Sequence, residues 1–114
     1  MIESGAGQAA GFEDAEFSEK GASIAADRSQ VFSTADVIAQ VRAFGANPDN
    51  GGADLDLIRD GQVVVGLCDP LLARDANRAL AERGATLFSL EMMPRTPAGT
   101  PQSWARISTG DNAK

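Results

Sequence analysis

Residues 62–68, Gln-Val-Val-Val-Gly-Leu-Cys, are a short run of apolar and β-branched side chains bounded by turn-forming residues. Such a run is typical of a strand that is buried on both faces of a parallel sheet. Residues 36–42 and 86–91 have the same character. The sequence therefore predicts three parallel strands at the centre of the fold.

Helical patterns separate these strands. The clearest covers residues 73–83, where Leu72, Ala76 and Leu80 recur at four-residue spacing and Gly84 follows as a C-cap. Shorter helices are predicted at residues 14–20 and 54–59. Strands and helices that alternate with short connections form βαβ units. The predicted fold class is thus α/β, an open parallel sheet with flanking helices.

The composition excludes several classes of function. The chain of 114 residues has a formal net charge of -6 and no cluster of Lys and Arg, which argues against nucleic acid. It has no histidine and no tyrosine, so Ser-His and Cys-His nucleophiles and most transition-metal sites are absent. We assign no catalytic and no metal-binding residue. No apolar run approaches the roughly 18 residues of a membrane span, so we expect a cytoplasmic protein without direct membrane insertion.

Cys68 is the single cysteine of the chain, so an internal disulfide is impossible. It ends the apolar run at residues 62–68, where a buried thiol is expected to be inert. A reducing, cytosolic setting fits this interpretation.

A glycine-rich segment near the N-terminus matches a dinucleotide-binding pattern. Gly5, Gly7 and Ala10 satisfy G-x-G-x-x-[G/A], and Asp27 lies about 20 positions further on, where such sites place an acidic residue. However, only residues 1–2 could form the preceding strand, and the following segment is short and polar. We interpret the segment as a landmark of a strand-to-helix corner rather than a phosphate cradle.

Other polar residues carry weaker signals. Residues 45–53 form a polar, glycine-rich stretch after the first predicted strand, at the sheet edge where α/β folds bind ligands. A plain surface loop is the commoner interpretation of such a stretch. Arg42 and Arg95 are placed near the same edge, although a surface role suits either arginine alone equally well. Two acidic pairs are predicted to be solvated surface residues without an acid–base role, Asp54 with Asp56 and Glu13 with Asp14.

Several motifs in one order resemble a known family. They include Glu-Ser-Gly-Ala-Gly-Gln-Ala-Ala-Gly-Phe at residues 3–12, Lys-Gly-Ala at 20–22, and Ala-Glu-Arg-Gly-Ala-Thr-Leu-Phe-Ser-Leu-Glu-Met-Met-Pro-Arg at 81–95. Over residues 3–95 the chain is similar to the N-terminal domain of the alanine dehydrogenase/pyridine-nucleotide transhydrogenase family, and most to the transhydrogenase alpha subunit.

The resemblance implies a Rossmann-like or flavodoxin-like domain that closes over NAD(H), while the dinucleotide fingerprint lies in a second domain. It implies hydride transfer between NAD(H) and NADP(H), coupled to proton movement through other transhydrogenase subunits, with peripheral attachment to the inner membrane through those partners. Alanine dehydrogenase chemistry is disfavoured. That enzyme has a basic residue at the position of Arg42, but also a histidine where this chain has Leu67-Cys68-Asp69.

The resemblance also points to cofactor-binding residues. Arg95 matches the first arginine of a family segment that contacts the nicotinamide end, and Gln102 echoes a glutamine of that segment at a longer spacing. The family's first strand and helix precede residue 3. We therefore expect residues 1–95 to be a partial domain, inactive alone and without tightly bound NAD(H). Residues 96–114, with Trp104 as their anchor, are expected to be an extended or disordered tail.

The sequence leaves an alternative open. Without a first strand, the domain would expose a sheet edge or an apolar face, which dimerisation would cover. The chain would then be a non-catalytic, self-associating interaction domain, and a homodimer is expected. An independent enzyme is the third choice, because no nucleophile–base set is present.

Overall fold

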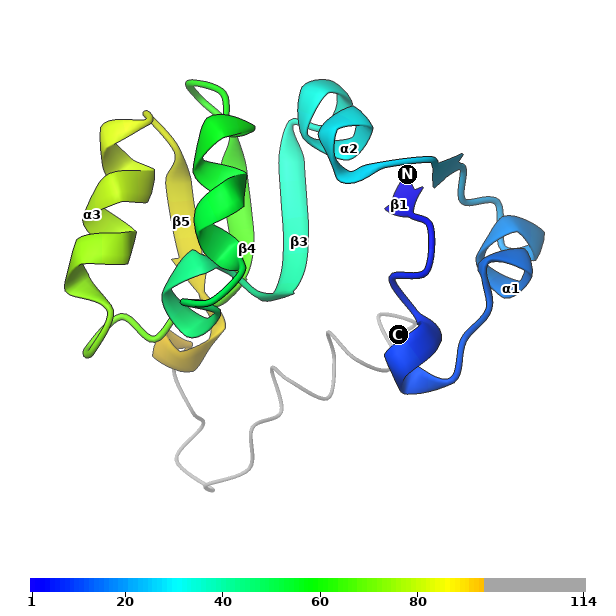
Figure 1. The fold of residues 1–114 in the computed structure, drawn as a ribbon, viewed down its shortest axis with the longest axis horizontal. Coiled ribbons are helices and arrows are strands. Elements are labelled where there is room, and N and C mark those ends of the chain that lie inside the picture. The colour runs from blue at the N-terminus through cyan, green and yellow to red at the C-terminus, as the bar shows by residue number, and fades with distance from the viewer. Residues whose placement is uncertain (94–114) are drawn as a thin grey trace, which may run out of the picture.

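The computed structural model describes residues 1–93 and contains two parallel sheets (Figure 1). The smaller sheet pairs β1 (Ile2–Glu3) with β2 (Ile24–Ala25), and the larger has the order β3-β4-β5. The strands of the larger sheet are β3 (Val37–Arg42), β4 (Val63–Leu67) and β5 (Thr86–Ser89). The α-helices are α1 (Asp14–Glu19), α2 (Arg28–Thr34) and α3 (Arg74–Glu82). Four 3-10 helices are η1 (Gln8–Ala10), η2 (Phe44–Ala46), η3 (Gly51–Asp56) and η4 (Leu90–Met92).

The larger sheet confirms the predicted α/β class and all three predicted strands. Its central strand β4 pairs in parallel with both neighbours, with Val64 between Ile38 and Leu87. β5 is shorter than the predicted segment, because the chain turns into η4 after Ser89. This turn lies at the carboxyl edge of the larger sheet.

The predicted long helix is α3, and Gly84 follows it with a φ of 77°. A left-handed residue ends a helix at little cost only when it is glycine. Leu72, which the four-residue spacing grouped with Ala76 and Leu80, precedes α3 and is 85% exposed, whereas Leu80 is buried. In place of the predicted helix at residues 54–59 the chain forms η3, which starts and ends earlier.

The helix α2 was not predicted. Its sequence, Arg-Ser-Gln-Val-Phe-Ser-Thr, contains β-branched and hydroxyl side chains that disfavour helices in isolation. Two features of the fold stabilise it. Asp27 caps its first turn by accepting a hydrogen bond from the backbone N–H of Gln30 at 2.8 Å. Phe32 is buried in the core beside the larger sheet.

The core lies on one face of the larger sheet. A single cluster of buried residues joins α2, β3, β4 and α3: Phe32, Ile38, Ala43, Ile58, Val64, Cys68 and Leu80. Figure 1 shows α3 with β5 on one side of the molecule and α1 with β1 on the other, with α2 between them. The carboxyl ends of β3, β4 and β5 therefore share one edge.

Two further sequence-based expectations concern the tail and the absence of a membrane span. The predicted tail at residues 96–114 and its anchor Trp104 lie outside the described residues. Within residues 1–93, none of the helices has the length and apolar character needed to cross a bilayer.

Candidate functional site

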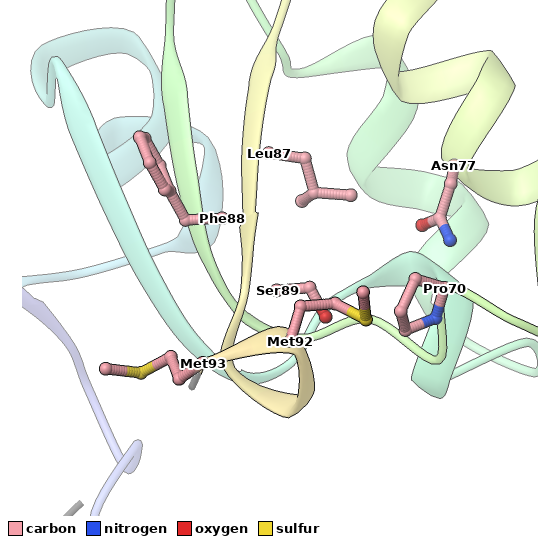
Figure 2. Close-up of a pocket in the computed structure, with 7 residues that line it drawn as sticks. All are labelled: Pro70, Asn77, Leu87, Phe88, Ser89, Met92 and Met93. Atoms are coloured by element: carbon pink, nitrogen blue, oxygen red, sulfur yellow. The ribbon is translucent and has the colours of Figure 1, made fainter. Parts of the chain in front are cut away.

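A pocket of about 530 Å³ opens at the carboxyl edge of the larger sheet (Figure 2). It lies beside the turn after β4, the end of β5 and one residue of α3. Its lining residues are Pro70, Asn77, Leu87, Phe88, Ser89, Met92 and Met93. In Figure 2 the thioether of Met92 lies close to Pro70, and Leu87 and Phe88 leave β5 in opposite directions. The pocket has apolar walls and two polar side chains, the combination that small-molecule sites use.

Glu91 connects two turns at this edge of the sheet through hydrogen bonds of its carboxylate. Its Oε1 accepts hydrogen bonds from the backbone N–H groups of Cys68 and Asp69, both at 2.8 Å, and its Oε2 accepts one from the Ser89 hydroxyl at 2.5 Å. Desolvation acts to raise the pKa of Glu91, but these hydrogen bonds outweigh it and the pKa is lowered. The carboxylate therefore fixes the turn after β4 to the segment after β5.

The turn after β4 has an unusual backbone. Asp69 has a φ of 46°, the one positive φ at a residue other than glycine within residues 1–93. Asp adopts this left-handed conformation more readily than most residues, but the conformation still costs free energy that the surroundings must supply. The hydrogen bond from the N–H of Asp69 to Glu91 offsets part of this cost. Such conformations are enriched at ligand-binding sites.

Asn77 brings an amide from α3 to the same edge. Its Nδ2 donates to the backbone carbonyl of Cys68 at 3.2 Å. Its Oδ1 is buried and, within residues 1–93, accepts no hydrogen bond. An unpaired buried acceptor is costly unless another group donates to it. The space around Asn77 Oδ1 is tightly packed. A Cβ added to Gly45 would overlap the Cys68 carbonyl and would lie 3.0 Å from Asn77 Oδ1.

Cys68 is buried, as predicted. Its thiol donates to the carbonyl of Gly66 at 3.1 Å. Burial, together with the negative charge of Glu91, raises the pKa of the thiol. A thiolate is the reactive form of cysteine, so this environment suppresses nucleophilic chemistry.

Arg42 ends β3, where the sequence placed it. Its Nε donates to the carbonyl of Ala46 at 2.6 Å, so the side chain closes the loop of η2. The predicted cofactor-binding residues Arg95 and Gln102 lie outside the described residues. Met93, the last described residue, lines the pocket, so the chain leaves the described part of the structure at this site.

The glycine-rich segment does not have the geometry of a phosphate cradle. The N–H of Gly5 donates to the carboxylate of Asp14 at 2.9 Å, and the Ser4 hydroxyl donates to the same carboxylate at 2.7 Å. An anionic group of the chain itself thus occupies the position that a phosphate would need. These two hydrogen bonds also lower the pKa of Asp14. The segment joins β1 to α1 by way of η1, the strand-to-helix corner that the sequence predicted.

Three acidic residues have structural roles that the sequence analysis did not assign to them. Asp14 was predicted to be only solvated, but it binds the glycine-rich segment. Asp27, at the position of a ribose-binding acid, caps α2 instead. Asp54 was predicted to lie on the surface but is 3% exposed, paired with Arg28. Its partner lies 26 residues earlier in the chain, and no local sequence pattern reveals such a pair.

Sequence reasoning missed Glu91 and Asn77 as members of the site. The position of Glu91, two residues after Ser89 at the end of a predicted strand, was a usable signal, because strand carboxyl ends converge on ligands. Asn77 carried none, since a polar residue within an amphipathic helix usually faces solvent. Metal-ligand clusters of three or more His, Cys, Asp or Glu are not found within residues 1–93.

Comparison with known proteins identifies the family to which the chain belongs. Residues 1–107 match the family model described as "Alanine dehydrogenase/PNT, N-terminal domain". The chain is 30% identical over 95 residues to the NAD(P) transhydrogenase subunit alpha of Cereibacter sphaeroides, covering 83% of this chain and 17% of that subunit. It is 33% identical over 95 residues to the first of the NAD(P) transhydrogenase alpha-subunit polypeptides of Rhodospirillum rubrum, covering 83% of this chain and 24% of that polypeptide.

Solved structures agree with these relatives. The crystal structure of transhydrogenase from Sinorhizobium meliloti superposes with a TM-score of 0.71 at 32% identity, over 85% of this chain and 27% of that one. An L-alanine dehydrogenase superposes with a TM-score of 0.71 at 23% identity, over 87% of this chain and 25% of that one, which shows a shared fold. The chain thus spans only about a quarter or less of the length of these relatives. It belongs to the family of alanine dehydrogenase and pyridine-nucleotide transhydrogenase N-terminal domains.

Proposed function

We propose that this chain forms part of the NAD(H)-side domain of a proton-translocating NAD(P) transhydrogenase. The relatives that support this are named transhydrogenase alpha subunits. The observation that carries the proposal is the pocket at the carboxyl edge of the sheet, whose lining includes Met93, the last described residue. The complete protein would transfer hydride between NAD(H) and NADP(H).

The residues of the pocket suit the nicotinamide end of NAD(H). The side chains of Leu87, Met92 and Pro70 offer an apolar surface for a flat ring. A carboxamide carries both a donor and an acceptor. Asn77 and Ser89, the two polar side chains of the pocket lining, can pair with such a group.

The role of the chain in this site is binding and orientation. Cys68 is held in its unreactive thiol form, and no histidine is present to transfer a proton. The cofactor itself supplies the hydride chemistry, and the protein holds its ring and excludes water. We assign Arg95 and Gln102 to the same contact, because Arg95 matches the family's motif. A guanidinium fork also suits a carboxamide or phosphate oxygen.

Alone, the chain should be catalytically silent and should bind NAD(H) weakly. Hydride transfer requires two nicotinamides at close range, and the rest of the alpha subunit and its partners would position them. In the assembly this domain would lie in the cytoplasm, attached to the inner membrane only through other transhydrogenase subunits.

The test is a titration of the isotopically labelled chain followed by NMR. We expect NADH and nicotinamide mononucleotide, at millimolar concentration, to shift the amides of Asn77, Ser89 and Met92, whereas AMP leaves them unchanged. The variant Arg95→Ala should reduce these shifts at a given concentration, and Arg106→Ala is the matched control from the same segment. Shifts centred on Gly5 and Gly7 would refute the site, and micromolar affinity for NADH would refute the weak binding expected of a partial domain.

A further inference from the structure

The Ser89 hydroxyl is the polar group that β5 contributes to the pocket at the carboxyl edge. Leu87 and Ser89 are two residues apart in the strand, so their side chains leave β5 on the same side. Figure 2 shows both directed toward the side where Asn77 of α3 lies. The direction of the hydroxyl hydrogen therefore decides which kind of ligand group this wall of the pocket can bind.

The hydrogen of this hydroxyl is used within the chain. Ser89 donates it to Oε2 of Glu91 at 2.5 Å. A serine hydroxyl has one hydrogen and two lone pairs, so Ser89 keeps only acceptor sites for a ligand. The Cys68 thiol is a second neighbour of Ser89, but sulfur is a weak acceptor beside a carboxylate. Ser89 thus contributes an acceptor to the pocket.

The charge of Glu91 keeps this direction fixed. The pKa of Glu91 is lowered, so at neutral pH its side chain is a carboxylate with no hydrogen to donate to Ser89. The other oxygen, Oε1, accepts from the backbone N–H groups of Cys68 and Asp69. These two hydrogen bonds hold the carboxylate in place, so Glu91 acts on the pocket through Ser89.

The same edge offers few donors to an anionic ligand. The backbone N–H groups of Cys68 and Asp69 both donate to Glu91, and Pro70 has no backbone N–H. The Nδ2 of Asn77 donates to the carbonyl of Cys68 at 3.2 Å. Of these groups, only the second hydrogen of the Asn77 amide remains for a ligand. An anionic group would therefore meet mainly the lone pairs of Ser89.

We propose that Glu91 positions the Ser89 hydroxyl so that the pocket selects a pyridine carboxamide over a pyridine carboxylate. The inference rests on the proposed function, because it takes the nicotinamide end to occupy this pocket. A carboxamide has an N–H₂ group for the Ser89 oxygen and a carbonyl oxygen for a donor such as Arg95, which we assign to the same contact. A carboxylate has no hydrogen and satisfies only the second of these.

The selectivity comes from the direction of one hydrogen bond. An N–H₂ group opposite the Ser89 oxygen forms this bond, whereas a carboxylate oxygen in the same place leaves two acceptors facing each other. The loss corresponds to about tenfold in affinity. Glu91 is exposed, so water screens its charge, and long-range repulsion of the ligand by Glu91 contributes less than the hydrogen bond.

The experiment compares two ligands that differ only in this group, nicotinamide mononucleotide and nicotinic acid mononucleotide. Each is titrated at neutral pH into the isotopically labelled full chain, and the amide shifts of Asn77, Ser89 and Met92 give the two dissociation constants. We expect the carboxamide ligand to bind about tenfold more tightly. This ratio should persist in about 1 M salt, where the Debye length is about 3 Å.

Two variants test the roles of the two residues. Ser89→Ala removes the acceptor and should reduce the ratio to about twofold or less. Glu91→Gln can donate an N–H to Ser89 and so release the hydroxyl hydrogen for the carboxylate ligand, and it should reduce the ratio at least as much. Ser18→Ala is the matched control, because the Ser18 hydroxyl donates to the Asp14 carbonyl within α1 at 3.1 Å, and it should leave the ratio unchanged. A merely structural effect would weaken both ligands alike.

Three outcomes would overturn the inference. Equal affinities of the parent chain for the two ligands would show that the pocket does not select the carboxamide. A ratio that Ser89→Ala leaves at about tenfold would place the selectivity in another residue. Either result leaves the proposed function intact. If nicotinamide mononucleotide does not shift the amides of Asn77, Ser89 and Met92, the proposed function fails and this inference fails with it.

Discussion

The guanidinium of Arg28 donates two hydrogen bonds to the carboxylate of Asp54, from Nε to Oδ1 at 2.5 Å and from Nη2 to Oδ2 at 2.7 Å. Arg28 begins α2 and Asp54 lies in η3, so the pair connects the N-terminal elements to the larger sheet. Glu3 of β1 accepts a third hydrogen bond from Arg28, and Gln40 of β3 donates to Asp54. The hydrogen bonds to Asp54 raise the pKa of Arg28 against the effect of burial, so the arginine stays charged.

We expect Arg28→Ala to lower the free energy of unfolding by about 3 kcal/mol, because it leaves the buried carboxylate of Asp54 without its charge partner. The estimate is at the low end of the range for buried pairs, since Arg28 is 39% exposed and Gln40 still donates. Urea denaturation at neutral pH measures the change.

The control for this prediction is Arg83→Ala. Arg83 pairs with Asp56 at 2.7 Å, but the two side chains are 47% and 84% exposed. Exposed pairs contribute about 0–1 kcal/mol, so the control should be nearly neutral. Equal losses of unfolding free energy in Arg28→Ala and Arg83→Ala would show that the Arg28–Asp54 pair is not what connects the N-terminal elements to the larger sheet.

The larger sheet was predictable because its signals are local. The runs around Val64, Ile38 and Leu87 are apolar and short. Gly61 turns the chain just before β4 with a φ of 79°, and Gly84 follows the end of α3 with a φ of 77°. What joins the elements was not predictable. The pairing of Arg28 with Asp54 depends on the three-dimensional approach of two polar segments, each of which looks like solvated surface in the sequence.

The glycine-rich segment provides a second prediction. A Cβ on Gly7 would lie 2.5 Å from the ring of Phe17 and 2.8 Å from the backbone carbonyl of Phe12. Gly7→Ala should therefore destabilise the chain by about 2 kcal/mol, since the backbone carbonyl cannot move aside as a side chain can. Gly52→Ala is the control, because its Cβ would meet nothing closer than 3.6 Å, and we expect a change within about 0.5 kcal/mol. Urea denaturation of both variants measures the difference.

Asp27 gives a third prediction, which separates capping from ribose binding. Asp27→Ala should cost about 1 kcal/mol, because it removes the hydrogen bond to the first turn of α2. Asp27→Asn keeps an oxygen at the same position and should lose much less. Thermal unfolding of both variants measures this. If Asp27→Ala leaves the stability unchanged while Asp27→Asn weakens NADH binding, the capping interpretation is wrong.

The candidate site was predictable in position but not in composition. Parallel strands direct a ligand to their carboxyl ends, so the edge that contains Arg42 was identified from the sequence. The left-handed backbone at Asp69 and the hydrogen bonds of Glu91 arise only when the turns after β4 and β5 meet. Neither follows from a pattern within one segment.

Glu91 gives the last prediction, a pH dependence. Its pKa is lowered from the ordinary value of 4.5, so the folded state favours its charged form. Stability from this group is fully present above pH 4.5 and is lost as the pH falls through the lower, folded-state pKa. At neutral pH Glu91→Gln should be less stable than the parent chain, because a neutral amide is a weaker acceptor for the N–H groups of Cys68 and Asp69. The difference should shrink as the pH is lowered from 5 to about 3.

Chemical denaturation at a series of pH values measures this convergence. Other carboxylates, including Asp14 and Asp27, also lose stabilising charge in acid, but they are present in both proteins and cancel in the comparison. Glu82→Gln is the matched control, since the Glu82 side chain makes no hydrogen bond or ion pair within residues 1–93. Its profile should run parallel to that of the parent chain. A stability difference for Glu91→Gln that stays constant between about pH 7 and pH 3 would show that the carboxylate charge does not hold the two turns together.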